Sequence, residues 1–182
     1  MLAAALVAAA VFCNALGGPF VYDDVVEIQD NERIHSLSRI PELIATDFWG
    51  AGEGRNPLYR PLTAVVMAAV WAAGGGGPFL YHLLNVLLHA AASALVVSVL
   101  LSLTGRLPMA LAAGLLFAAH PVHTEAVAWI SGLGELLSAV CLLAAWRAHA
   151  QGGVGAAAAW MAPALLSKEG AIVFPALAMT GD

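Results

Sequence analysis

The amino-acid sequence predicts an all-α membrane protein: a bundle of several spanning helices with short helices in its first loop. Hydrophobic residues make up 61% of the 182 residues and charged residues only 10%, whereas a soluble domain has about 25% charged residues. The charges are also clustered, since eight of the twelve acidic residues and four of the seven basic ones lie between residues 17 and 60. That segment is therefore expected to be an aqueous loop, and the remainder of this single domain is expected to lie mostly in the bilayer.

Residues 2–16 are the first candidate span. They lack the basic n-region of a signal peptide and end in a weak cleavage site. We therefore expect a span that is retained and that lacks its cytoplasmic beginning. Cys13 and Cys141 both lie in apolar runs. We interpret them as buried hydrophobic residues rather than as a disulfide pair.

Residues 17–78 are predicted to form an outer loop with interfacial helices. Residues 36–44 carry cap and start signals for a helix, and Phe48 and Trp49 suit a membrane interface. Asp23 and Asp24 follow the first span directly, and a carboxylate pair at the mouth of a membrane protein is a candidate general base. The alternative is that an aspartate caps a helix of the loop.

Further spans are predicted within residues 79–182. Residues 79–103 and 126–148 are long enough for a span of roughly 20 residues. Residues 107–119 are short for a span and end at a His-Pro pair, and residues 154–179 are apolar but carry Ser-Lys-Glu near their middle.

The topology depends on residues 61–73. If they cross the bilayer, Asp23 and Asp24 lie on the opposite face from residues 120–125. If they lie in the interface, both groups share the outer face, together with residues 167–169. Thirteen apolar residues are short for a crossing, and the following glycines and proline continue a helix poorly. We favour the interfacial arrangement because it brings the unusual polar groups together.

Polar residues inside the apolar segments have alternative interpretations. His82, Asn85 and His89 lie on one helical face and are expected to hydrogen-bond to neighbouring helices. His120, His123 and Glu125 are spaced like metal ligands, but the proline after His120 and the lack of a further ligand favour a substrate-facing or loop-bracing role. No metal site is predicted.

Five motifs occur in a fixed order over almost the whole chain: FVYDDVV (residues 20–26), YRPLT (59–63), PFLYHLLNVLLH (78–89), LFAAHPVHTEAV (116–127) and LLSKE (165–169). Together they resemble the membrane half of the transmembrane and tetratricopeptide-repeat O-mannosyltransferases. The chain stops after about half of the spans expected for that family and has no tetratricopeptide repeats. We therefore expect a fragment or a partial gene, and we do not count on activity from this piece alone.

The resemblance implies a GT-C glycosyltransferase, a multi-pass enzyme of the bacterial inner membrane or the endoplasmic reticulum with its active site on the outer or luminal face. It implies a polyprenyl-phosphate sugar donor, mannose as the sugar and a Ser or Thr of an acceptor protein as the acceptor, with inversion. In that superfamily an acidic pair in the first outer loop holds the catalytic base, which implies this role for Asp23 with Asp24 as its neighbour. GT-C enzymes differ in metal dependence, and no cofactor is predicted beyond the lipid-linked donor. No nucleic-acid partner is expected.

Such a transfer needs a carboxylate that accepts the hydroxyl proton, groups that stabilise the leaving phosphate and a route for the lipid. Arg60, His123 and Lys168 are the candidates for binding the donor phosphate. The candidates for lining the substrate cavity are His120, Glu125, Glu135 and Glu169.

These residues also have structural interpretations. Arg60 could extend toward lipid headgroups, Glu135 could pair with another intramembrane polar group, and Lys168 could form an ion pair with Glu169. A transporter or flippase-like protein with a polar path is the alternative function. It would be expected to show broken helices in two matched halves, and the sequence has no such symmetry.

Overall fold

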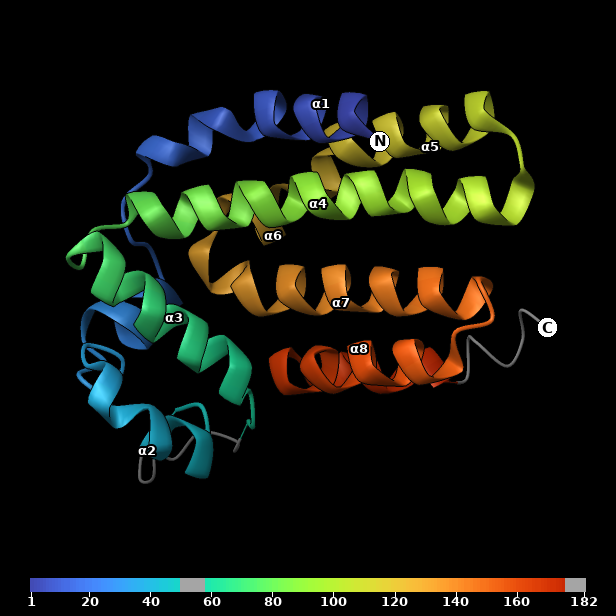
Figure 1. The fold of residues 1–182 in the computed structure, drawn as a ribbon. Helices are drawn as coiled ribbons and strands as arrows, with labels where there is room; N and C mark the ends of the chain where they lie inside the picture. The colour runs from blue at the N-terminus through green and yellow to red at the C-terminus, as the bar shows by residue number, and fades with distance from the viewer. Residues whose placement is uncertain (50–57, 176–182) are drawn as a thin grey trace.

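The computed structural model describes residues 1–49 and 58–175, and within these ranges the chain forms helices and no β-strand. The all-α prediction is confirmed. Loop residues Glu53 and Arg55, and the end of the predicted 154–179 run, lie outside the described residues. The long helices are packed side by side in a bundle, with two further helices at one end (Figure 1): α1 (Leu2–Phe12), α4 (Phe79–Thr104), α5 (Leu107–Ala119), α7 (Leu133–Ala150) and α8 (Val154–Ser167), with α2 (Ile40–Ala45) and α3 (Pro61–Gly74) at the end.

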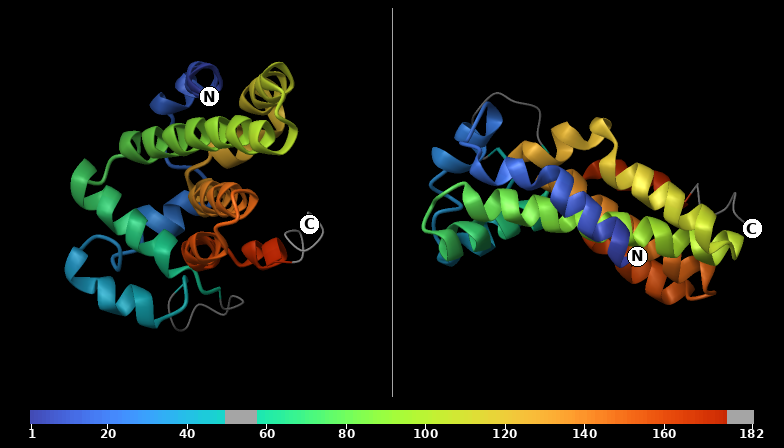
Figure 2. Two further views of the ribbon diagram at one scale, coloured as in Figure 1. Left: turned by 45° about the vertical axis from the view of Figure 1, so that its right-hand side comes forward. Right: turned by 90° about the horizontal axis from the view of Figure 1, so that it is seen from above.

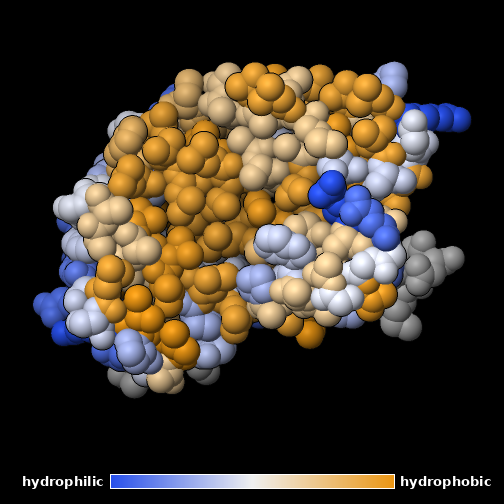
Figure 3. Space-filling model, in the orientation of Figure 1, coloured by the Kyte–Doolittle hydropathy of each residue, from blue (hydrophilic) through white to orange (hydrophobic). Residues whose placement is uncertain are grey.

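The bundle has the hydrophobicity of a membrane domain. Among the described residues, α4 and the segment Ile130–Ala150 are long and apolar enough to cross a membrane. Helix α5 and the following segment Pro121–Ala128 would form a third span, bent by 46°. Apolar side chains cover much of the face in Figure 3, and hydrophilic residues gather toward its ends. The chain is therefore an all-α membrane helical bundle.

Helices α1 and α4 are antiparallel. Ala4 packs with Val97 in one apolar cluster, while the rings of Phe12 and His89 lie 5.0 Å apart. Helix α1 consequently stops at the end of the bundle where α4 starts. We call this the loop end.

Helix α3 lies obliquely across the loop end instead of running along the bundle (Figures 1 and 2). Proline at its first position fits a helix start, and Gly75, with φ of 63°, ends it in the left-handed region. The Tyr81 hydroxyl of α4 donates to the Met67 carbonyl of α3 at 2.8 Å. Both ends of the 17–78 segment thus lie at the loop end. This is what the prediction that residues 61–73 do not cross the bilayer requires. The position of α3 in the bilayer stays a prediction.

The first loop folds onto α3. It contains a π-helical turn, η2 (Val25–Gln29), a 3₁₀ turn, η3 (Leu37–Arg39), and α2. Ser36 accepts from the Ser38 N–H at the start of η3, which confirms the predicted cap signal. Ile28, Ile34 and Leu43 are buried with Met67 of α3 in one core. Each such side chain contributes about 1.5–3 kcal/mol when it leaves water.

The span predicted at residues 126–148 is confirmed as Ile130–Ala150, but its predicted start is wrong. Helix α6 (Thr124–Ala128) is followed by a 3₁₀ turn, η5 (Ile130–Gly132), before α7 begins. The turn is tight, because a Cβ on Gly132 would lie 2.4 Å from the Ala126 carbonyl oxygen. Helix α8 also ends earlier than predicted, at Ser167, and the Ser-Lys-Glu motif lies at its end rather than inside a span.

The polar stripe of α4 is bonded as expected. His82 Nε2 donates to the Gly18 carbonyl at 3.1 Å, Asn85 to that of Trp129 at 3.0 Å, and His89 Nε2 to that of Ala118 at 3.1 Å. All three residues are buried. They anchor α4 to three other segments. The bond from His89 to α5 is interhelical, as predicted, whereas His82 and Asn85 bond to residues that lie between helices.

The two cysteines differ. Both are free thiols, as predicted, and Cys141 is buried. Cys13 is exposed, so the expectation that both are buried is wrong. It lies in η1 (Cys13–Gly17), the short turn with which the first helix leaves the bundle.

Basic residues lie at both ends of the bundle. Arg106 precedes α5 and Arg147 lies in the last turn of α7, both at the end opposite the loop. Arg33, Arg39, Arg60 and Lys168 lie at the loop end, and the outer position of that end stays a prediction.

Thiol labelling tests this topology. In a background with Cys13→Ala and Cys141→Ala, single cysteines at Asp30 and Thr124 are expected to react with a membrane-impermeant maleimide from the same side. Gln151, in the exposed turn between α7 and α8, is the control and should react only after permeabilisation. Labelling of Asp30 and Thr124 from opposite sides would contradict the arrangement.

Candidate active site at the loop end

Asp24 joins the first loop to the start of α7. It is fully buried, and its Oδ1 accepts from the backbone N–H of Ser131 at 2.8 Å and from the Ser131 hydroxyl at 2.7 Å. Its Oδ2 accepts from the Val21 N–H at 3.1 Å. A buried carboxylate is stable only with such partners. The helix-cap alternative is wrong, because no side-chain cap bond is made at η2 and the carboxylate bonds to a distant turn instead.

The turn before Asp24 is strained. Tyr22 has φ of 52°, which is unusual for a residue with a side chain, and such conformations persist where surrounding contacts impose them. Those contacts are the Asp24 bond to Val21 and a bond of 3.4 Å from the Trp129 indole N–H to the Val21 carbonyl. After this turn, the side chains of the adjacent Asp23 and Asp24 point in different directions.

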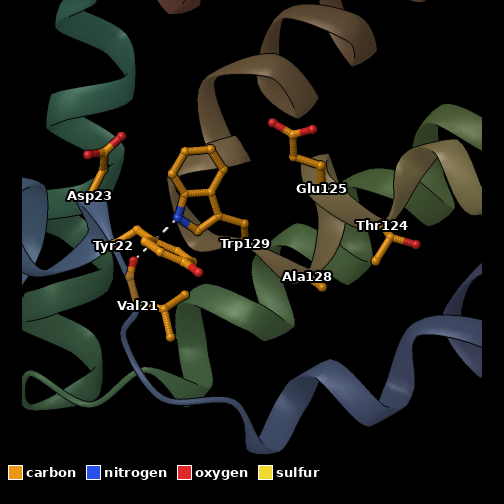
Figure 4. Close-up of a pocket in the computed structure, with 7 residues that line it drawn as sticks. All are labelled: Val21, Tyr22, Asp23, Thr124, Glu125, Ala128 and Trp129. Carbon is orange, nitrogen blue, oxygen red and sulfur yellow. Dashed lines mark hydrogen bonds between the residues drawn. The ribbon is translucent and has the colours of Figure 1, made fainter.

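Asp23 faces a pocket of about 600 Å³. Figure 4 shows the Asp23 and Glu125 carboxylates on either side of the Trp129 indole ring. The structure thus brings two of the predicted site residues, from the first loop and from α6, to one pocket. Its lining consists of Val21, Tyr22, Asp23, Thr124, Glu125, Ala128 and Trp129.

Glu27 is a buried carboxyl group that the sequence did not single out. Its residue is only 7% exposed. Burial raises the pKa of Glu27 to about 7, and the charges of Asp23 and Asp24 raise it as well, while contact with the Ser131 side chain and the charge of Arg60 lower it. Three carboxyl groups therefore lie close together at the loop end.

The predicted phosphate-binding cations are paired with carboxylates. Arg60 makes a bidentate bond to Glu169, with Nε to Oε2 at 2.9 Å and Nη2 to Oε1 at 2.6 Å. Lys168 pairs with Glu135. The predicted pair between Lys168 and Glu169 is therefore wrong, whereas the expectation that Glu135 pairs with another polar group is confirmed. These pairs hold α3, α7 and the end of α8 together.

His120 and His123 lie apart from Asp23. They line a second, mostly apolar pocket of about 420 Å³ against α5. The His123 ring lies 4.2 Å from that of Phe117 and 5.0 Å from that of His89, and His120 accepts from the Val122 N–H at 3.2 Å. Both histidines thus brace the turn between α5 and α6, and they face a different pocket from the one that Asp23 lines.

No group of three His, Cys, Asp or Glu side chains in residues 1–49 and 58–175 is arranged to hold a metal ion.

Some of the site residues could have been found from the sequence. Glu27 has valine on one side and isoleucine on the other, and a single acid in an apolar run signals a buried carboxyl. Ser131 carries no such signal, because its role exists only once the first loop meets the start of α7.

Comparison with curated proteins gives relatives over about three quarters of the chain. Mouse protein O-mannosyl-transferase TMTC3 is 41% identical over 147 residues, which cover 79% of this chain and 16% of that protein. Protein O-mannosyl-transferase Tmtc2 of Drosophila melanogaster is 39% identical over 143 residues, which cover 76% and 15%. The chain belongs to the TMTC family of protein O-mannosyl-transferases.

A more distant member, human TMTC4, is 37% identical over 154 residues, which cover 75% of this chain and 21% of that protein. The chain thus spans about a fifth or less of the length of these TMTC relatives. No family model and no solved structure matches it. The resemblance predicted from the five motifs is confirmed.

The buried Asp24 of this TMTC chain is expected to be a major contributor to stability. Asp24→Ala should lower the free energy of unfolding by about 1–3 kcal/mol, because the Val21 and Ser131 donors lose their acceptor. Asp30→Ala, which removes an exposed carboxylate of the same loop, is the control and should change it by less than about 0.5 kcal/mol. Denaturation in detergent micelles measures both, and equal effects would contradict the anchoring role.

The Arg60–Glu169 pair predicts a dependence of stability on pH. The hydrogen bonds from Arg60 hold the pKa of Glu169 down to about 2, from an ordinary value of 4.5. A lowered carboxyl pKa contributes stability above the unfolded pKa, and this contribution is lost as pH falls from 4.5 toward 2. The effect should be small because the Glu169 side chain is 57% exposed.

Glu169→Gln should therefore flatten the unfolding free energy over this acid range in the wild-type background. In an Arg60→Met background the same substitution should have a smaller effect. An equal effect in both backgrounds would contradict the coupling.

Proposed function

We propose that the chain forms the base-bearing part of a membrane mannosyltransferase that moves mannose from a polyprenyl-phosphate donor to Ser or Thr hydroxyls of proteins. The observation that carries this proposal is the contrast between Asp23 and Asp24. Asp24 is enclosed and saturated with donors, whereas Asp23 lines a pocket and can accept a proton there. The names of the relatives support mannose and a protein acceptor, and the GT-C mechanism is the one this carboxylate suits.

In the proposed reaction, Asp23 is the general base. The acceptor hydroxyl oxygen attacks the anomeric carbon of the sugar, and its proton passes to the Asp23 carboxylate. The bond from the anomeric carbon to the phosphate oxygen breaks, and the polyprenyl phosphate leaves with the electron pair. Attack opposite the leaving group inverts the anomeric configuration.

The remaining pocket residues suit a sugar. Glu125 is an exposed carboxylate that can accept hydrogen bonds from sugar hydroxyls. Tyr22 and Trp129 offer flat apolar surfaces on which a sugar ring can rest. Trp129 is also held by its bond to Val21, so its ring needs no reordering on binding.

The donor phosphate has to compete with carboxylates for Arg60 and Lys168. Arg60 and Lys168 do not line the Asp23 pocket, and each already has a carboxylate partner. In this proposal the phosphate displaces Glu169 or Glu135, and the released carboxylate remains nearby. His123 faces the second pocket and is a weaker candidate for this role.

The interior of the bundle favours a transferase over a transporter. His82, Asn85 and His89 would be the polar path of a transporter, but each is bonded to a backbone carbonyl of a neighbouring segment. The exposed polar groups gather instead at the loop end. An active site on the outer or luminal face suits this arrangement, since lipid-linked donors reach it from the bilayer.

Asp23→Asn in the full-length gene product should abolish sugar transfer while leaving membrane insertion intact. Loss of a general base lowers the rate by roughly 10²–10⁴-fold. The assay uses membranes, polyprenyl-phosphate mannose and a Ser- and Thr-containing acceptor protein. Asp30→Asn is the control, since it removes an exposed carboxylate outside the pocket and should retain activity. Undiminished transfer by Asp23→Asn would refute the assignment of the base.

A further inference from the structure

Asn85 is a buried amide within the apolar helix α4, and it does not line the Asp23 pocket. Its Nδ2 donates to the Trp129 carbonyl at 3.0 Å. That carbonyl also accepts from the Gly132 N–H at 3.1 Å, so both of its lone pairs are used. The backbone of Trp129, at the end of α6, is therefore held from two directions.

The bond to Trp129 uses only half of the Asn85 side chain. A carbonyl can only accept, so the amide must turn its NH₂ group toward Trp129. Its Oδ1 then points elsewhere and has no hydrogen-bond partner among the residues that the structure describes. A buried polar atom without a partner lowers stability, and a leucine of similar size would leave no such atom. The asparagine is therefore better explained by what its NH₂ group holds than by stability.

His82 makes a matching contact one turn earlier on the same face of α4. Its Nε2 donates to the Gly18 carbonyl at 3.1 Å, and its Nδ1 has no partner in the described part of the chain. The approach is close, because a Cβ on Gly18 would lie 2.9 Å from His82 Nε2. Three residues after Gly18 the chain reaches Val21, which lines the pocket.

Two walls of the pocket thus rest on one helix. The wall from the first loop carries Val21 and Asp23 and is joined to α4 through His82, while the wall that contains Trp129 is joined to α4 through Asn85. A direct bond from the Trp129 indole N–H to the Val21 carbonyl also joins the walls. Its length of 3.4 Å exceeds the usual range of about 2.7–3.2 Å. The shorter bonds to α4 are therefore expected to set the distance between the indole ring and the base.

We propose that Asn85 is a positioning residue for the donor sugar: by holding the Trp129 carbonyl, it fixes the indole ring on which the sugar rests relative to the Asp23 carboxylate. Figure 4 shows this ring between the carboxylates of Asp23 and Glu125. A fixed ring keeps the anomeric carbon in line with the acceptor hydroxyl, and small errors in such placement are costly. The inference rests on the proposed function for its effect on transfer. The fixing of Trp129 by Asn85 is independent of it.

The first test compares Asn85→Leu with Ser93→Ala in the full-length gene product. Leucine keeps the approximate volume of Asn85 but removes the NH₂ donor. Ser93 is the control, since it is a buried polar residue of α4 whose hydroxyl bonds to the His89 carbonyl of the same helix. Asn85→Leu should lower kcat by about tenfold or more and change KM for the donor less, because the lipid and phosphate still contribute to binding. Ser93→Ala should retain both constants.

A double-mutant cycle shows whether Asn85 acts through the Trp129 ring. In a Trp129→Ala background the ring is gone, and Asn85→Leu should lower transfer by less than about twofold further, since two residues that act as a unit are not additive. An equal loss in both backgrounds would overturn the proposal. So would wild-type transfer by Asn85→Leu.

Tryptophan fluorescence tests the geometry without a transfer assay. The Trp129 contribution is the difference in emission between a protein and its Trp129→Phe variant, measured in each background. Asn85→Leu should raise the acrylamide quenching constant of this contribution, because the ring is no longer held, and Ser93→Ala should leave it unchanged. Unchanged quenching in Asn85→Leu would overturn the fixed ring. Absence of transfer in the wild type, or undiminished transfer by Asp23→Asn, would refute the proposed function and leave this result intact.

Discussion

The bond between Asp24 and Ser131 is the contact on which the rest of the loop end depends. It joins residues 107 positions apart in the chain and closes the first loop against the turn that starts α7. A carboxylate without water is held only by donors, and the structure supplies three of them from two segments. The strained Tyr22, the direction of Asp23 and the kink between α6 and α7 all adjoin this one anion.

Electrostatics divide the molecule along the bundle. The described acidic residues gather at the loop end, while Arg106 and Arg147 occupy the other end. At the loop end, Arg60 and Lys168 are matched to Glu169 and Glu135. Charged groups in a membrane domain pair with one another, and these pairs join α3, α7 and the end of α8 where the polar chemistry is concentrated.

The sequence predicted the helices whose ends have local signals. Pro61 and the glycines after α3 limit that helix, and the His-Pro pair ends α5, so both elements were expected close to their observed bounds. The break before α7 was not expected, because residues 126–148 are mostly apolar and contain no proline. The break coincides with the long-range Asp24–Ser131 bond and with the close local approach of Gly132 to Ala126.

The same limit applies to the site. The acidic pair and Glu125 were visible in the sequence, and Asp23 and Glu125 line one pocket, but the sequence gives two adjacent aspartates the same chemistry. Their environments give the two aspartates different roles, as in sites where neighbouring carboxyl groups have different functions in catalysis. A base needs a free lone pair that faces the substrate, and Asp24 is enclosed and held by three donors. Asp23 lines the pocket and is therefore the candidate base.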